Sequence, residues 1–265
     1  MNKAATFHAL HAGPEVLTLP NAWDAASAKL METLGAKAVA TSSAAVAWSH
    51  GYADGHHMPV SAAVLTVREA ARVLNVPLTA DIEGGYSDDP AEVGHTAAMI
   101  MDAGAVGINL EDGGGSAELL ARKIEAVRAA AQKLGVDLFI NARADVYLRK
   151  LAEGEAAVAE TLRRAALYRE AGASGLFAPG VVEPGHIETI ARECGLPLNV
   201  MARPGVPPAA ELARLGARRL SSATGISRAA LHATAEATRA FLATGDSDSL
   251  SAAGGGAGDY NALFR

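Results

Sequence analysis

The chain has 265 residues, of which 50% are hydrophobic, 20% charged and 5% aromatic, which indicates a globular protein of one large or two small domains and excludes a mainly disordered chain. A single cysteine excludes an internal disulfide or a cysteine-based zinc site, and a net charge of -6 argues against nucleic acid as the main partner. No apolar run approaches the roughly 20 residues that cross a bilayer, and Met1–Pro20 lacks the apolar core of a signal peptide, so we expect a cytoplasmic protein with no membrane partner.

Short runs rich in Val, Leu and Ile alternate along the chain with longer segments of helical period. In chain order, the expected strands are Val16–Ala22, Ala38–Ala44, Val76–Glu83, Ala105–Asp112, Asp137–Asp145, Gly175–Gly180, Pro197–Ala202 and Arg218–Ala223. The expected helices are Asp24–Leu34, Val60–Leu74, Pro90–Ala103, Ala117–Leu134, Ala152–Ala171, Pro184–Glu193, Pro208–Leu215 and Ile226–Thr244. This alternation predicts a parallel sheet covered by helices, and eight such units predict an α/β fold, the (β/α)8 TIM barrel. The alternative is a doubly wound open sheet, but no predicted strand has the charged character of a sheet edge.

Composition also marks the helix ends and the tail. A Gly-Ala pair precedes several strands, at Gly35, Gly104, Gly172 and Gly216, and each glycine is expected to cap a helix before an αβ turn. We expect residues 1–245 to form a single barrel domain and residues 246–265 a flexible tail, because Asp246–Gly258 is rich in Ser, Gly and Asp. The final Tyr260, Leu263 and Phe264 could dock on the barrel or on another subunit.

Polar residues gather at the carboxyl ends of the predicted strands, where the active sites of such barrels lie. These ends contain Trp23 and Asp24, Thr41–Ala44, Asp81–Tyr86, Glu111 and Asp112, and Arg143–Asp145, and strand seven contains Asn199. Carboxylates crowded in this way repel each other unless a cation joins them, and oxygen ligands without a Cys or His cluster favour Mg²⁺ or Mn²⁺ over zinc. Asp81 and Glu83 are two apart on a strand and should face the same side.

The same residues predict a site for a small oxo-acid. Arg143 offers a planar fork to a substrate carboxylate, and the hydroxyl-rich turn Thr41–Ser43 offers backbone N–H groups to the other end of the substrate. A metal ion at this site would polarise a keto oxygen and stabilise an enolate.

The sequence resembles the isocitrate lyase/phosphoenolpyruvate mutase superfamily from about Leu17 to about Leu242. The resemblance is carried by Leu19–Asp24, Thr41–Ala44, Ser49–Asp54, Asp81–Tyr86, Ile108–Asp112, Ala142–Asp145 and Phe177–Gly180. It implies an Mg²⁺-dependent enzyme that makes or breaks a bond next to a 2-oxo acid or its enolate. It also implies exchange of the last helices between the subunits of a homodimer or homotetramer.

Residue roles follow from the same resemblance. Asp81 should contact the metal directly, and Glu83 and Glu111 should hold it mostly through water. Trp23 should form a wall of the substrate pocket, and Arg143 should bind the substrate. The turn of Ser42, Ser43 and Ala44 should contact the substrate carboxylate, with the backbone N–H groups of Ser43 and Ala44 as donors. Asp54 should support the metal or its water.

Two departures from the superfamily pattern matter. Strand three usually carries D-x-D-x-G-Y, and here the second acid is Glu83. The loop K-[KR]-C-G-H of the isocitrate and methylisocitrate lyases is replaced by Asp112–Ser116, which also lacks the lysine and asparagine of the mutases.

We therefore expect an Mg²⁺-dependent lyase that cleaves a C–C bond of, or decarboxylates, a small 2-oxo acid such as pyruvate, oxaloacetate or 2-oxoglutarate through an enolate. A metal-bound water or Tyr86 would return the proton. The alternatives are phosphonopyruvate or phosphoenolpyruvate mutase or hydrolase chemistry, and a non-catalytic barrel that binds oxo-acids.

Each motif also has a structural interpretation. Asp81 and Glu83 could be a solvated pair, Glu111 and Asp112 could be acids at the start of a helix, and Arg143 could form an ion pair with Asp145. Thr41–Ser43 could cap a turn, Trp23 could pack in the core, and Asn199 could form hydrogen bonds with the backbone. We interpret Asp112 in this structural way. His50, His56 and His57 lack the spacing of a metal site and are interpreted as surface-loop or lid residues.

Overall fold

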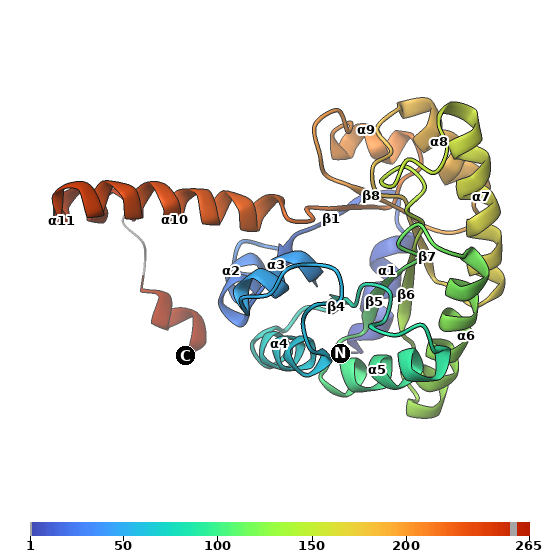
Figure 1. Ribbon diagram of the computed structural model, residues 1–265, viewed down its shortest axis with the longest axis horizontal. Helices are drawn as coiled ribbons and strands as arrows, with labels where there is room; N and C mark the ends of the chain where they lie inside the picture. The colour runs from blue at the N-terminus through green and yellow to red at the C-terminus, as the bar shows by residue number, and fades with distance from the viewer. Residues whose placement is uncertain (1, 255–258) are drawn as a thin grey trace.

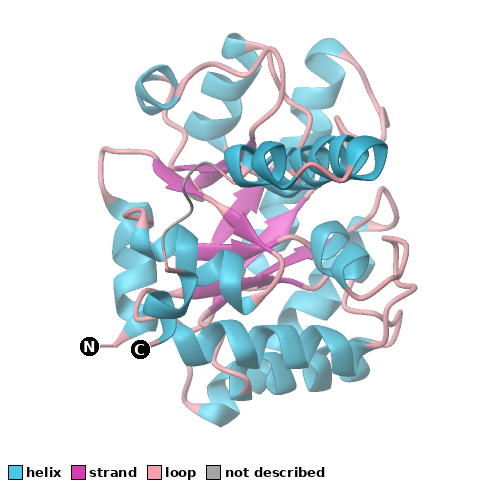
Figure 2. Cartoon of the chain, turned by 90° about the vertical axis from the view of Figure 1, so that its left-hand side faces the viewer, coloured by secondary structure: helices cyan, strands magenta, loops and turns pink. Residues whose placement is uncertain are grey.

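The computed structural model describes residues 2–254 and 259–265, and its centre is a parallel sheet rolled into a barrel (Figure 2). The strands are β1 (Leu17–Leu19), β2 (Asn21–Ala22), β3 (Val39–Thr41), β4 (Leu78–Asp81), β5 (Gly107–Glu111), β6 (Phe139–Arg143), β7 (Gly175–Phe177), β8 (Leu198–Met201) and β9 (Arg219–Ser221). β1 and β2 are separated only by Pro20, and they pair with β9 and β3 respectively. They are two halves of one barrel strand, so the predicted (β/α)8 fold is confirmed.

Helices surround this sheet, and all eight predicted helices are present within a few residues of their expected bounds. The helices are α1 (Lys3–Ala12), α2 (Ala25–Thr33), α3 (Ser43–Ser49), α4 (Val60–Val73), α5 (Pro90–Asp102), α6 (Ala117–Leu134), α7 (Gly154–Glu170), α8 (Pro184–Glu193), α9 (Ala209–Arg214), α10 (Gly225–Thr244), α11 (Ser247–Ala253) and the 3₁₀ helix η1 (Tyr260–Phe264). α1, α3, α11 and η1 were not predicted. Among the described residues, we find no helix whose length and apolar character would let it cross a membrane.

Local sequence signals set the helix ends. The Asp24 side chain accepts a hydrogen bond from the backbone N–H of Ser27 at 2.6 Å and caps α2, while Ser116 accepts one from Leu119 at 3.1 Å and caps α6. The glycines of the four Gly-Ala pairs have φ angles between 89° and 110°, a left-handed region in which glycine alone carries no steric cost. The predicted glycine caps are therefore confirmed.

The amino-terminal end of the barrel is closed by α1. Phe7 is fully buried and packs against Phe139, the first residue of β6, with ring centroids 5.3 Å apart. His11 stacks on the same ring at 4.1 Å. A Cβ on Gly107, the first residue of β5, would lie 2.7 Å from the Phe7 ring, so a glycine is required there. This plug leaves the carboxyl end of the barrel as the open end.

The last long helix, α10, projects away from the barrel instead of covering it (Figure 1). Of the described residues of α10, Ser227 alone is buried. α11 continues this arm over Ser247–Ala253, within the segment predicted to be a flexible tail, and residues 255–258 of that segment lie outside the described residues. The flexibility of the tail stays a prediction. η1 lies against α2.

Candidate active site

Three adjacent strands end in charged side chains that meet at the open end of the barrel. Asp81, Glu111 and Arg143 are the last residues of β4, β5 and β6. The strand register pairs Glu111 directly with Arg143, and Asp81 with Asn109 two residues before Glu111. The predicted convergence of these residues at one mouth is thus a consequence of strand order and register.

Arg143 is the central cation of this mouth. Its Nη1 lies 2.5 Å from Glu111 Oε2, and its Nε and Nη2 donate to the two oxygens of Asp145 at 2.6 and 3.0 Å. The bidentate pair with Asp145 is the ion pair considered above as the structural alternative. It fixes the plane of the guanidinium, which lies over the Phe177 ring at 5.8 Å.

Asp112 supports Arg143 indirectly, through Asp145. The interpretation of Asp112 as a helix-start acid is wrong. Its side chain is fully buried and accepts hydrogen bonds from Arg164 Nη1 at 2.7 Å and from the Tyr168 hydroxyl at 2.6 Å. It also accepts one from the backbone N–H of Asp145 at 3.0 Å. Asp112 therefore fixes the backbone of Asp145, and the Asp145 side chain in turn fixes Arg143.

Asp81 is embedded in backbone and hydroxyl groups of β3 and α3. Its Oδ2 accepts from the backbone N–H of Ser43 at 3.4 Å, its Oδ1 accepts from that of Glu83 at 3.3 Å, and its own N–H donates to Thr41 Oγ1 at 2.9 Å. Burial raises the pKa of Asp81, and the charge of Arg143 opposes the rise. The predicted turn of Ser42, Ser43 and Ala44 is buried directly beside this carboxylate.

Glu83 lies beyond the end of β4 and contacts the loop that contains His56. The sequence analysis did not predict this contact. Its Oε2 accepts from the backbone N–H of His56 at 2.5 Å, and His56 Nε2 accepts from the N–H of Gly84 at 3.0 Å. Glu83, Tyr86 and His56 have φ angles of 53°, 62° and 63°. Left-handed backbone in non-glycine residues is strained and clusters at functional sites, so the loop and the Asp81–Tyr86 segment are fixed together in a costly conformation.

The electrostatics of the mouth favour a bound cation. Burial raises the pKa of Glu83 to about 7, with further contributions from the charges of Asp54 and Asp81. Burial also raises the pKa of Glu111, although Arg143 opposes this. Asp54 itself is exposed on the loop before His56. Arg143 pairs with Glu111 and Asp145, and the buried guanidinium of Arg219 interacts with Asp81. The pKa values of the carboxylates are still raised, so a further positive charge would stabilise their ionised forms.

The donor atoms at the mouth are carboxylate oxygens, which suit a cation that keeps most of its water. In the part of the chain that the structure describes, no group of three or more His, Cys, Asp or Glu side chains is placed so that it could hold a metal ion. The donor set still fits Mg²⁺, which usually keeps several waters and takes one or two carboxylates. Within the described residues, Glu83 Oε1 is buried without a hydrogen-bond partner, as an oxygen facing a water or cation would be.

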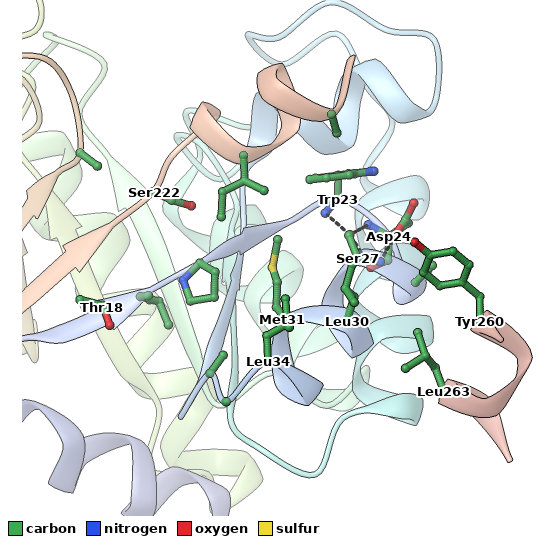
Figure 3. Close-up of a pocket in the computed structure, with 18 of the residues that line it drawn as sticks. Thr18, Trp23, Asp24, Ser27, Leu30, Met31, Leu34, Ser222, Tyr260 and Leu263 are labelled. Carbon is green, nitrogen blue, oxygen red and sulfur yellow. Dashed lines mark hydrogen bonds between the residues drawn. The ribbon is translucent and has the colours of Figure 1, made fainter. Parts of the chain in front are cut away.

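Other predicted site residues have different surroundings. Asn199 is buried inside the barrel, where its Oδ1 accepts from Ser221 Oγ at 3.3 Å. The Tyr86 hydroxyl is buried without a hydrogen-bond partner among the described residues, and burial raises the pKa of Tyr86 far above its ordinary value. Trp23 lines an apolar groove beside α2 and the base of α10 (Figure 3). Contact of Asn199 or Trp23 with a substrate stays a prediction.

Four functional candidates were missed by the sequence reasoning or were given another role. Asp145 orients Arg143, Asp112 orients Asp145, His56 holds Glu83, and Lys123 of α6 donates to the carbonyl of Gly84 at 2.9 Å. Of these four contacts, only the one between Arg143 and Asp145 could be expected from the sequence, because the two residues are two apart on the predicted strand. Asp112 meets Arg164 and Tyr168 across 52 and 56 residues of chain, a separation that no local pattern records.

Comparisons with known proteins show which family the chain resembles along most of its length. The family model described as phosphoenolpyruvate phosphomutase matches residues 7–242. An uncharacterized protein of Mycobacterium tuberculosis (strain H37Rv) is 36% identical over 241 residues, which cover 89% of this chain and 88% of that protein. An oxaloacetate decarboxylase of Pseudomonas fluorescens (strain SBW25) is 29% identical over 263 residues, which cover 93% and 88%. The crystal structure of a candidate phosphonomutase from Burkholderia cenocepacia J2315 is similar with a TM-score of 0.86 at 38% identity, covering 90% of this chain and all of that one.

Proposed function

Because the chain belongs to the phosphoenolpyruvate phosphomutase family, we propose that it is an Mg²⁺-dependent lyase that cleaves a C–C bond of, or decarboxylates, a small 2-oxo acid. The observation that carries the proposal is that Asp81, Glu111 and Arg143 end three adjacent strands, with Arg143 paired to Glu111 and with Glu83 two residues beyond Asp81. Oxaloacetate is the first substrate to test, since a relative of nearly equal length is an oxaloacetate decarboxylase. Pyruvate and 2-oxoglutarate follow.

In this proposal the side chains at the mouth bind the Mg²⁺ ion and orient the substrate. Asp81 would contact the ion directly, and Glu83, Glu111 and the exposed Asp54 would contact its water molecules. When bound, Mg²⁺ would polarise the 2-oxo group and stabilise the negative charge left by bond cleavage.

The substrate carboxylate would lie between the Arg143 guanidinium and the backbone N–H groups of Ala44 and Ser43, of which the Ser43 N–H would exchange its long 3.4 Å contact with Asp81 for the substrate. Arg143 is rigid in its pair with Asp145, so its position is set before the substrate arrives. Tyr86 stays protonated at neutral pH, because burial raises the pKa of its hydroxyl, and it can donate a proton at that oxygen.

The proposal is tested by following product formation by ¹³C NMR with Mg²⁺ and each of the three acids. Because Mg²⁺ alone decarboxylates oxaloacetate slowly, a protein-free sample and the Asp81→Ala variant are the controls. Turnover by the wild type and background rates for D81A are expected. Saturable oxalate binding without turnover would instead support the non-catalytic barrel, and ³¹P NMR with phosphonopyruvate tests the mutase or hydrolase alternative.

We also propose that the chain forms a homodimer or homotetramer by packing α10 and α11 on a second copy. Support comes from the exposure of Leu242 (78%) and Phe241 (41%) on a helix with almost no buried surface. The groove of Figure 3, about 800 Å³, leaves apolar surface beside the base of α10 uncovered. Light scattering should show a dimer or larger for the wild type and for the control Arg239→Ala, and a smaller species for Leu242→Asp. A monomeric wild type would contradict this proposal.

A further inference from the structure

The connection between α3 and α4 contains Asp54, and we call its residues 51–57 the Asp54 strap. Every residue of the strap is exposed. The residues that flank it are fixed, because His50 Nε2 lies 2.8 Å from Thr66 Oγ1 of α4, and Met58 is buried against side chains of α3 and α4. The strap is therefore an exposed arc that is held firmly at its two ends.

His56 joins the middle of the strap to the segment that follows β4. Its backbone N–H donates to Glu83 Oε2 at 2.5 Å, and its Nε2 accepts from the backbone N–H of Gly84 at 3.0 Å. Among the described residues, no other hydrogen bond links residues 53–57 to the rest of the chain. Attachment of this stretch to the mouth of the barrel therefore depends on one residue.

The His56 ring fits closely against its neighbours. A Cβ on Gly84 would lie 3.1 Å from His56 Cε1, so a side chain at position 84 would push the ring away. The centroid of the ring also lies 5.5 Å from that of Tyr86. The backbone of His56 is left-handed, with a φ angle of 63°, and such strain persists only where the surroundings impose it. These contacts therefore determine the conformation of the strap.

The strap places the charge of Asp54 near the mouth. Burial and neighbouring charges raise the pKa values of Asp81, Glu83 and Tyr86, and the charge of Asp54 contributes to all three shifts. Within the described parts of the chain, the Asp54 side chain itself has no hydrogen-bond or ion-pair partner. The position of Asp54 is therefore set by the backbone of the strap, which is attached two residues away at His56.

We infer that His56 is a positioning residue, which holds the Asp54 strap where the Asp54 carboxylate can reach the water molecules of a bound cation. The inference rests on the proposed function, since it takes Asp81 and its neighbours as the cation site. Without the His56 ring the strap would keep its fixed ends but lose its contact with Gly84, and Asp54 would then spend part of the time away from the cation. This role belongs to a connection after α3, distinct from the Asp112–Ser116 segment after β5.

Hydrogen exchange of the cation-free protein tests the attachment without any turnover. Mass spectrometry compares the wild type, His56→Ala, His56→Gln and the control His57→Ala, an exposed histidine of the same strap, over peptides that contain residues 50–58 and 82–87. Loss of one hydrogen bond should speed exchange of both peptides about fivefold in H56A, whereas H57A should match the wild type. H56Q should restore most of the protection, because its amide oxygen can accept from Gly84. Equal exchange in H56A and the wild type would overturn the inference.

A double-mutant cycle on the affinity for Mg²⁺ tests whether the attachment acts through Asp54. In calorimetric titrations at one pH, Asp54→Asn and H56A should each weaken Mg²⁺ binding several-fold, and the double variant should bind no more weakly than the weaker single variant. Additive losses would overturn the inference, since His56 would then act through Glu83 alone, and so would wild-type affinity in H56A. Failure of the wild type to bind Mg²⁺ would instead refute the proposed function and with it the role of Asp54, while the exchange experiment would still show whether His56 holds the strap.

Discussion

The carboxylates at the mouth should make the affinity for Mg²⁺ depend on pH near neutrality. Burial raises the pKa of Glu83 from 4.5 to about 7, and it also raises the pKa values of Asp81 and Glu111. A proton on any of these groups competes with the cation, so binding must release protons. Since burial raises the pKa of Glu111 to about 8, the affinity should increase as the pH rises through 7 and level off only above 8.

The magnitude follows from Glu83 alone. With a pKa of about 7, roughly nine tenths of the Glu83 side chains carry a proton at pH 6 and roughly one tenth at pH 8. Lowering the pH from 8 to 6 should then weaken Mg²⁺ binding about tenfold, or about 1.4 kcal/mol. Asp81 and Glu111 act in the same direction and can only enlarge the change.

Calorimetric titrations with Mg²⁺ at pH 6, 7 and 8, in buffers of different ionisation enthalpy, measure both the affinity and the protons released. Glu83→Gln should bind Mg²⁺ more weakly at pH 8 and show a smaller dependence on pH. The exposed Glu92→Gln on α5 is the matched control and should behave as the wild type. An affinity that is the same at pH 6 and 8, with no proton release, would refute the electrostatic reasoning.

Three further predictions concern stability, each measured by urea unfolding. His11 is buried with a pKa lowered from 6.5 to about 3, chiefly by burial; its neutral form contributes stability that is complete above pH 6.5 and is lost as the pH falls toward 3, about 5 kcal/mol in all, and His11→Phe should flatten that slope. Asp112→Ala removes the acceptor of the Tyr168 hydroxyl and of the Asp145 backbone N–H, while Arg164 keeps Glu160 and the carbonyl of Gly115, and it should cost about 1–3 kcal/mol; a loss below 1 kcal/mol would contradict its supporting role. Gly107→Ala places a Cβ 2.7 Å from Phe7 and 2.9 Å from Thr79 Oγ1 and should cost about 1–3 kcal/mol; unchanged stability would contradict this close packing.

The barrel could be predicted because its signals are local and repeated. Each strand is a short apolar run, each helix shows a 3.6-residue period, and the Gly-Ala pairs mark the turns between them. α1 escaped prediction because its position depends on a partner far along the chain: Phe7 and His11 gain their surroundings only from Phe139. α11 escaped because its capping residue Asp246, which accepts from the N–H groups of Asp248 and Ser249, also suits a loop.

The carboxylates of the site could be predicted for the same reason, since a barrel brings the ends of its strands together whatever the intervening sequence. Their supports could not. Asp112 looks like many acidic residues before a helix until Arg164 and Tyr168 of α7 close over it. Lys123 looks like a solvent-facing lysine of an amphipathic helix until its amine meets the carbonyl of Gly84.

Glu83 shows how a departure from a family motif can be explained by its neighbours. Its two oxygens have separate surroundings: Oε2 accepts from the backbone of His56 at 2.5 Å, and Oε1 is buried with no partner in the described parts of the chain. An aspartate at this position is one methylene shorter and could not keep the His56 contact while presenting its second oxygen at the same point. The longer acid therefore connects the loop of Asp54 and His56 to the Asp81–Tyr86 segment, and the left-handed backbone of Glu83 and His56 is the strain that accompanies this connection.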